Sequence, residues 1–166
     1  PSSGRIEITT KSPLTGLFFD STFGGMFAAL QKRAGFEAIT ITGRAAQPVY
    51  LLVHEDGAEI KPASDLWGQY TQATNHAIRD REQGEVEVLS IGPAGERLVR
   101  FACAVHTWDK SRDGVAGRGG LGAVMGAKHL KAVAVPGKRK TTVADPAAIK
   151  TLLSDIREPL KIGTAG

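Results

Sequence analysis

The chain contains 166 residues with 42% hydrophobic and 23% charged side chains, the composition of a globular protein with one domain or two half-domains around a shared core. Its net charge of +4 is mild, and its Lys and Arg residues are neither interleaved with aromatic residues nor gathered into a recognition helix, so no nucleic-acid partner is expected. The single cysteine, Cys103, excludes a disulfide framework, and without a transmembrane run or a signal peptide at its head we expect a cytoplasmic chain with no membrane partner.

Hydrophobic alternation and turn residues predict strands through most of the first half of the chain. A segment of small apolar residues with helical spacing follows Gly24 and Gly25. The turn Glu55–Gly57 lies between two alternating runs, which is a strong hairpin signal. The elements expected here, in chain order, are a strand over 5–10, a turn over 11–16, a helix over about 25–34, a buried strand over 36–42 and a hairpin of strands 49–54 and 58–61.

The second half is predicted to alternate helices and strands before a charged linker and a last helix. This last helix has the clearest start, because Asp145 can cap it and Pro146 suits the first helical position. The elements expected here are a helix over 71–81, strands over 86–91 and 97–105, a loop over 106–118, a glycine-rich helix, a strand over 131–135, a linker over 138–140 and a helix with an apolar stripe that stops before Pro159.

Five glycines lie within nine residues from Gly114 to Gly122, directly before an apolar segment with helical spacing. Without a Cβ atom, such a loop lets a ligand lie against backbone N–H groups. Where a helix begins, the first N–H groups lack internal partners and the macrodipole adds positive potential, so the loop is suited to phosphate or pyrophosphate. Arg118 and Lys128 add positive charge. The alternative is a close-packed, glycine-rich helix that binds no ligand.

The pattern around these glycines also occurs earlier in the chain. The glycine pairs at 24–25 and 119–120 lie 95 residues apart, and each precedes a helical segment and a short strand that ends in glycine. The two copies extend over about 5–43 and 100–137. We therefore expect an α+β fold, an internally duplicated domain with two mixed or antiparallel sheets, a helix in each repeat and pseudo-twofold symmetry that places both helix starts beside one groove.

Other chemistries receive weaker support from the sequence. Gly117, Gly119 and Gly122 match the spacing of the dinucleotide-binding fingerprint, but a long loop is expected before them and no acidic residue ends the following strand to hold a ribose. The four histidines are scattered without metal-ligand spacing. His106 could face a ligand from its loop, although loop packing or a surface position is favoured. Glu96 is expected to order a turn.

Several motifs in a fixed order carry a resemblance to a known family. They are K-S-P-L-T-G at 11–16, the glycine pair at 24–25, A-G-F at 34–36, P-V-Y-L at 48–51, L-W-G at 66–68, I-G-P-A-G-E at 91–96 and G-R-G-G-L-G-A-V-M-G at 117–126. Together they resemble the amino-terminal domain of the tungsten-containing aldehyde ferredoxin oxidoreductase family, from Arg5 to about Gly137. The segment 161–165 is similar to the entry to the next domain of that family.

The resemblance implies a base of two sheets under a tungsten (or molybdenum) atom, which is held by the dithiolenes of two pterins. A magnesium ion joins the pterin phosphates and binds backbone carbonyls at positions that match Thr22 and Val115. Arg5 matches an arginine between a pterin and a [4Fe-4S] cluster, whose cysteines lie in later domains. The positions implied to contact the bis-pterin cofactor or the magnesium ion are Arg5, Thr22, Gly24, Gly25, Val115, Ala116, Gly117, Arg118 and Gly119.

The resemblance further implies a bis-pterin-binding domain over 1–137, with 138–166 a linker and helix leading toward a further domain. The whole enzyme would oxidise a small aldehyde to a carboxylic acid with ferredoxin as acceptor, and this fragment is not expected to be active alone. The chain departs from the family at Gly114, where Arg is frequent, at Thr22, where Asn is, at Val115, where Ala is usual, and at 127–129, where A-K-H replaces S-K-N. The alternative function is a non-catalytic phosphate- or nucleotide-binding module on the same fold.

Overall fold

The computed structural model of the chain describes residues 4–109, 112–139 and 141–162. Residues 4–139 form one compact unit, and the described residues from 141 onward belong to a second unit. In neither unit do the described residues include a helix long and apolar enough to cross a membrane.

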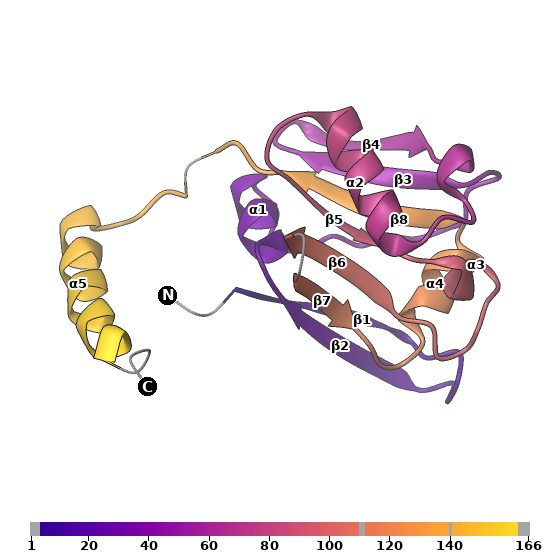
Figure 1. The fold of residues 1–166 in the computed structure, drawn as a ribbon, viewed down its shortest axis with the longest axis horizontal. Helices are drawn as coiled ribbons and strands as arrows, with labels where there is room; N and C mark the ends of the chain where they lie inside the picture. The colour runs from indigo at the N-terminus through magenta and orange to yellow at the C-terminus, as the bar shows by residue number, and fades with distance from the viewer. Residues whose placement is uncertain (1–3, 110–111, 140, 163–166) are drawn as a thin grey trace. The chain divides into compact units, whose positions relative to one another are not determined.

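The strands of the described residues form two sheets (Figure 1). In the larger sheet every neighbouring pair is antiparallel except β3 and β8, which are parallel. A two-stranded antiparallel sheet consists of β1 (Arg5–Lys11) and β2 (Phe18–Gly24). A six-stranded sheet has the order β4-β3-β8-β5-β6-β7, formed by β3 (Val49–His54), β4 (Gly57–Pro62), β5 (Val86–Ser90), β6 (Ala104–Asp109), β7 (Arg112–Ala116) and β8 (Leu130–Pro136).

Short helices connect these strands, and the longest helix of the larger unit, α2, lies across one face of the six-stranded sheet (Figure 1). The helices are α1 (Phe27–Arg33), the 3₁₀ turn η1 (Ser64–Leu66), α2 (Thr71–Glu82), α3 (Pro93–Glu96), α4 (Leu121–Ala127) and, in the second unit, α5 (Pro146–Ile162). Helix α5 begins as predicted, because the Asp145 carboxylate accepts hydrogen bonds from the N–H groups of Ala147 and Ala148 at 3.0 and 2.9 Å.

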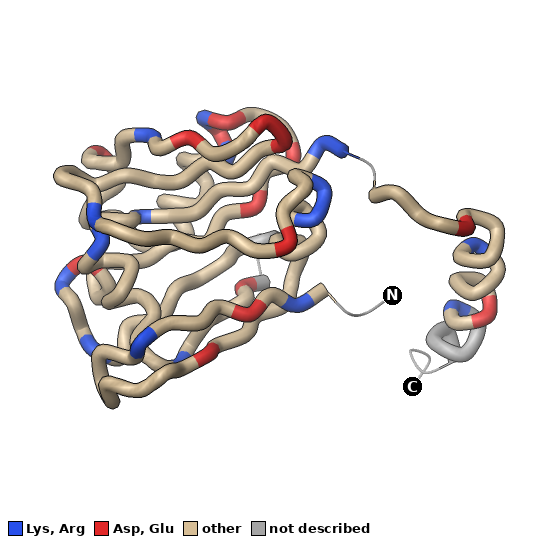
Figure 2. The backbone as a smooth tube through the Cα atoms, turned by 180° about the vertical axis from the view of Figure 1, so that it is seen from behind, with Lys and Arg blue, Asp and Glu red and all other residues tan. Residues whose placement is uncertain are grey.

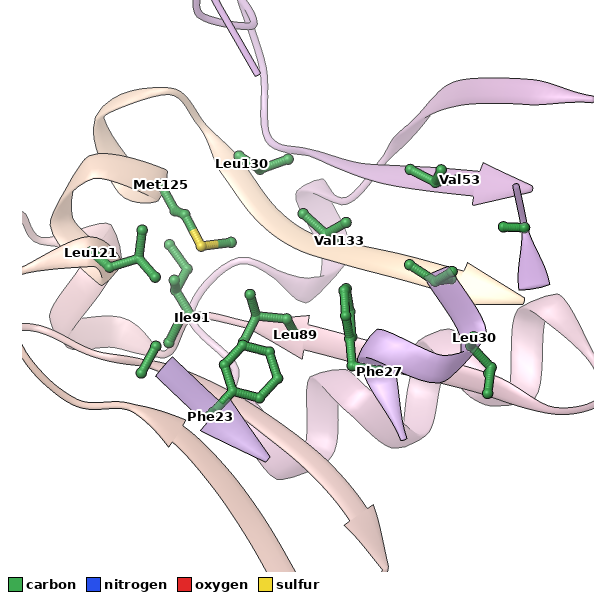
Figure 3. Packing of buried hydrophobic residues seen from close by; sticks show 14 residues of the cluster. Phe23, Phe27, Leu30, Val53, Leu89, Ile91, Leu121, Met125, Leu130 and Val133 are labelled. Carbon is green, nitrogen blue, oxygen red and sulfur yellow. The ribbon is translucent and has the colours of Figure 1, made fainter. Parts of the chain in front are cut away.

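Strands β5 and β8 are covered on both faces, and their side chains alternate between two hydrophobic clusters. Val88 belongs to the cluster under α2, which also contains Ile78 of that helix. Leu89 belongs to the cluster on the opposite face. Phe23 from β2 and Phe27 from α1 point into this second cluster (Figure 3). The two-stranded sheet and α1 are therefore joined to the larger sheet by a shared core.

Three predicted segments differ from the structure. Residues 36–42 form no strand: Phe36, although half-buried, packs on the core from an irregular segment whose carbonyl at Glu37 accepts a side-chain hydrogen bond from Gln31. Residues 97–103 form turns, and β6 begins only at Ala104, so Cys103 lies before the strand rather than within it. The predicted loop over 106–118 is instead largely the β6–β7 hairpin. Its polar composition resembles that of a loop because β7 is an edge strand.

The α+β class and the presence of two sheets are confirmed, as are the strands at 5–10, 86–91 and 131–135, the hairpin at 49–61 and the helix at 71–81. Each glycine pair follows a hairpin and precedes a seven-residue helix. The two copies differ, however, because the first lacks a strand after its helix. The internal duplication and its pseudo-twofold symmetry stay a prediction.

Candidate functional site

Strands β2 and β7 belong to different sheets but pass close to each other. A Cβ atom on Gly114 of β7 would lie 2.7 Å from the carbonyl oxygen of Gly24 in β2 and 3.1 Å from the ring of Phe23. Further along, a Cβ atom on Gly119 would lie 2.1 Å from the ring of Phe19. These two contacts show that the strands run in opposite directions along each other. We call residues 22–24 together with 114–115 the β2–β7 junction.

The junction brings together sequence-predicted positions that are about ninety residues apart in the chain. Thr22 is exposed, and Val115, with 44% of its surface exposed, directly follows Gly114. Arg5 pairs with Gly24 in the β1–β2 ladder and its Nη1 donates a hydrogen bond to Thr22 Oγ1 at 3.0 Å. Arg5, Thr22, Gly24 and Val115 therefore lie in one accessible region of the larger unit.

Two glycines of the predicted site leave open space beside the backbone. No atom lies within 4 Å of a Cβ built on Gly24, and at Gly117 the nearest is Val115 Cγ1 at 3.5 Å. Arg118 is exposed next to Gly117. Gly25 adopts a φ of 112°, a backbone conformation in which other residues are strained. A flat or anionic ligand could approach the main chain at these positions.

The remaining glycines of the loop serve close packing, as the ligand-free alternative predicts. A Cβ atom on Gly120 would lie 2.0 Å from the carbonyl oxygen of Arg100, and one on Gly126 would lie 2.0 Å from that of Gly95. The space beside Gly119 is likewise filled, by the ring of Phe19. Helices α3 and α4 meet through such contacts, so much of the glycine content reflects helix packing, and the open positions are Gly24 and Gly117.

The helix starts are less suited to anions than the sequence suggests. Helices α1 and α4 have seven residues each, which limits their dipoles. The N–H of Gly122, expected to lack a partner, donates to the carbonyl oxygen of Ala102 at 2.9 Å. Ala116 is fully buried, so only its backbone could face a ligand. The expectation of unpaired amides is thus wrong at Gly122.

The dinucleotide fingerprint lacks its structural context. Strand β7 ends at Ala116, so the long loop expected before Gly117 is not present. The ladders β7–β6, β6–β5 and β5–β8 are all antiparallel, which makes β7 antiparallel to β8 across α4. A dinucleotide-binding βαβ unit requires parallel strands. The topology therefore excludes a Rossmann-type site at these glycines.

Charge does not mark a separate site among the described residues of the larger unit. Lys and Arg are scattered over it together with Asp and Glu (Figure 2). The described residues contain no group of three or more His, Cys, Asp or Glu that could hold a metal ion. Groups near the junction that could hold an anion are the guanidinium groups of Arg5 and Arg118 and the open backbone.

The structure contains a buried ion pair that was not predicted from the sequence. Lys131 lies in β8 with no exposed side-chain surface, and its Nζ donates to Glu96 Oε1 at 2.5 Å and to the carbonyl oxygen of Gln69 at 2.8 Å. Burial lowers the pKa of Lys131, and Glu96 opposes that shift. Glu96 also accepts the N–H of Gly68 at 2.8 Å, so it orders the loop after η1. The available signal was a lone lysine in the apolar run Leu130–Val135.

His106 is also placed differently from its prediction. It lies in β6, fully buried, rather than in a loop or at the surface. Its Nε2 is 2.6 Å from Glu87 Oε2, and the same oxygen accepts from Arg79 Nη2 at 2.9 Å. The His106 ring packs against Phe23 with ring centroids 5.5 Å apart. This cluster lies beside the β2–β7 junction, because His106 pairs with Gly114 in the β6–β7 ladder.

Comparison with known proteins identifies relatives of the whole chain. The family model described as aldehyde ferredoxin oxidoreductase, N-terminal domain, matches residues 1–137. A tungsten-containing aldehyde ferredoxin oxidoreductase of Pyrococcus abyssi is 44% identical over 163 residues, covering 97% of this chain and 26% of that protein. An aliphatic sulfonate oxidoreductase, WOR-like subunit, of Pyrococcus furiosus is 33% identical and covers 94% of the chain and 27% of the relative.

A solved structure is similar as well. The active site complex BamBC of benzoyl coenzyme A reductase, in complex with 1,5 dienoyl-CoA, contains a chain that matches with a TM-score of 0.86 and 35% sequence identity. The match covers 95% of the present chain and 24% of that chain. The chain therefore spans about a quarter of the length of the relatives it matches.

Proposed function

Because the chain belongs to the aldehyde ferredoxin oxidoreductase family, as its amino-terminal domain, we propose that it is the cofactor-binding part of a larger tungsten (or molybdenum) bis-pterin oxidoreductase. The observation that carries the proposal is the β2–β7 junction, where the exposed residues Thr22 and Val115 and the open Gly24 come together, with Arg5 of β1 and the open Gly117 beside them. The internal duplication is part of this proposal, since the two hairpin–helix units would each serve one pterin.

The residues at the junction fit such a cofactor. Thr22 and Val115 are exposed on two neighbouring strands, so their carbonyl oxygens are candidates for a magnesium ion that bridges the pterin phosphates. Gly24 and Gly117 leave room for a pterin to lie against the main chain. Arg5 offers a guanidinium that is already oriented by Thr22. When bound, the pterin-held metal supplies the redox chemistry, and the protein supplies position and charge.

We propose a small aldehyde as substrate, oxidised to the carboxylic acid, with ferredoxin as electron acceptor. The support is the identity to tungsten-containing aldehyde ferredoxin oxidoreductases, which exceeds that to the sulfonate enzyme. The [4Fe-4S] cluster would be bound by domains outside this chain, which would also cover the pterins. A cytoplasmic location is part of the same proposal.

The test is oxidation of aldehydes by the full-length polypeptide, purified without oxygen from cells supplied with tungstate or molybdate, with ferredoxin or a viologen dye as acceptor. We expect activity in the full-length protein and none in the reconstituted 166-residue chain, which lacks cluster ligands. A full-length protein that contains neither metal nor pterin would favour the non-catalytic phosphate-binding module. Aldehyde oxidation by the isolated chain would contradict the proposal that activity requires further domains that bind the [4Fe-4S] cluster.

A further inference from the structure

Arg79, Glu87 and His106 form a connected set of buried polar side chains, here called the buried triad. They come from α2, β5 and β6, and His106 has no exposed surface. One carboxylate oxygen, Oε2 of Glu87, is 2.6 Å from His106 Nε2 and 2.9 Å from Arg79 Nη2. The carboxylate therefore joins a cation from one face of the sheet to an imidazole on the other.

The triad occupies the point where the β5–β6 ladder ends. The two strands pair at Leu89 with His106 and at Ser90 with Val105. Beyond these pairs the Arg79 guanidinium replaces the ladder: its Nε donates to the carbonyl oxygen of Val86 at 2.9 Å, and its Nη2 donates to that of Thr107. Arg79 thus donates hydrogen bonds to both strands and to Glu87, and these bonds fix the position of the carboxylate.

On its other side the triad meets the β2–β7 junction. The His106 ring packs against Phe23 and Phe27, with centroids 5.5 and 5.8 Å away. Phe23 is the residue between Thr22 and Gly24, and Gly114 is the ladder partner of His106. The imidazole therefore packs on Phe23 of β2, while the backbone of the same residue pairs with β7 at Gly114.

Strands β2 and β7 belong to different sheets, so their spacing is set by the side chains that pack beneath them rather than by a shared ladder. A buried ionic group is costly, and an apolar residue of similar volume would often fill the same space equally well. Here the ionic group fixes the orientation of the imidazole, and an apolar side chain in the same space could not do so.

We propose that His106 is a positioning residue for the cofactor-binding junction, a role that rests on the proposed function. Through its bond to Glu87, His106 holds Phe23, and Phe23 holds the main chain of β2 against β7 at Gly114, next to the two residues that would offer carbonyl oxygens to magnesium. His106 itself contacts no cofactor in this arrangement. Its replacement should therefore weaken retention of the metal more than its effect on stability would explain.

The experiment compares three variants of the full-length enzyme. His106→Phe keeps the ring and loses the bond, Glu87→Gln keeps an acceptor for the imidazole, and Lys131→Met removes a buried charge from a different cluster. Melting temperature is measured first. The rate at which magnesium and tungsten are lost during dialysis against EDTA is then measured for each protein.

We expect His106→Phe to lose both metals roughly tenfold faster than wild type, the low end of the effect seen when residues that orient metal ligands are removed. Glu87→Gln should be intermediate, and Lys131→Met should match wild type despite a lower melting temperature. Equal loss rates in wild type and both triad variants would overturn the positioning role and leave the proposed function intact. Faster metal loss from Lys131→Met as well would show that the effect of His106→Phe comes from a general loss of stability. A full-length wild-type protein that contains neither tungsten nor molybdenum would overturn both.

Discussion

The carbonyl oxygen of Gly24 occupies the space into which a side chain on Gly114 would extend, since a Cβ atom there would lie 2.7 Å from it. The closeness of these residues joins the two halves of the candidate site. An arginine at position 114 could not be accommodated here without moving β2 or Phe23. The close approach of β2 and β7 therefore depends on the glycine at position 114 as well as on the fold.

Gly114→Ala should therefore destabilise the protein. The added methyl group must displace main chain, which cannot move as a flexible side chain can, and overpacking of this kind costs about 1–3 kcal/mol. Chemical denaturation of the 166-residue chain measures the change in the free energy of unfolding.

Gly117→Ala is the matched control for Gly114→Ala. Gly117 lies three residues further along, just after β7 ends, and its Cβ atom would be 3.5 Å from Val115 Cγ1, an ordinary contact. We expect its free energy of unfolding to stay within about 0.5 kcal/mol of wild type. Equal losses in the two variants would contradict the close approach of β2 and β7.

The buried pair of Lys131 and Glu96 gives a second prediction for stability. Glu96→Gln leaves the buried ammonium without a counter-charge, which costs about 3–5 kcal/mol when a buried pair is broken. The same substitution at Glu37, whose side chain is 82% exposed beside Lys32, should change stability by less than about 1 kcal/mol. Similar effects at the two positions would show that Lys131 is hydrated.

Glu82 should make the stability of the protein decrease in the acid range. Although burial disfavours its charged form, hydrogen bonds from Tyr50 and Lys61 hold the Glu82 pKa below its ordinary value of 4.5. A carboxylate with a lowered pKa stabilises the folded state above its unfolded pKa, and this contribution is lost as pH falls through the folded value. The free energy of unfolding should thus decrease below about pH 4.5.

Glu82→Gln should flatten this acid decrease, and Tyr50→Phe, which removes one hydrogen bond worth about 1 kcal/mol, should reduce it in part. The measurement is a series of denaturation curves from pH 7 downward. An acid slope that is unchanged in Glu82→Gln would assign the slope to other carboxylates.

How much the sequence could predict depended on whether a pattern was local. The strand at Arg5, the hairpin around Glu55–Gly57 and the cap at Asp145 each rest on neighbouring residues, and the structure confirms them. The apolar alternation at 36–42 predicted a strand, yet it has no partner strand to pair with. The hairpin at 106–118 was hidden by its polar composition.

The candidate site was predicted in the same uneven way. The resemblance selected Arg5, Thr22 and Val115, and the structure brings them to one junction. The packing roles of Gly119 and Gly120 and the burial of His106 depend on contacts with distant segments. No local pattern reports such contacts, so the sequence could not separate glycines that pack from glycines that leave space.

Arg5 should matter for the cofactor rather than for the fold. Arg5→Ala in the full-length enzyme is expected to lower tungsten and pterin content or slow the reduction of ferredoxin, because an exposed guanidinium at the junction is lost. Thr22→Val removes the hydroxyl that orients Arg5 but keeps the backbone carbonyl, so it should retain magnesium and show a weaker form of the same defect. Wild-type cofactor content and ferredoxin reduction in Arg5→Ala would count against the role.

The most direct measurement locates the metal itself. Crystals of the full-length enzyme, grown without oxygen, are to be measured on both sides of the tungsten absorption edge. If the proposed function is right, one strong anomalous peak will lie outside the protein backbone on the exposed side of the β2–β7 junction. A peak on another face of this domain, or the absence of tungsten and molybdenum from active crystals, would contradict the assignment of the junction as the cofactor site.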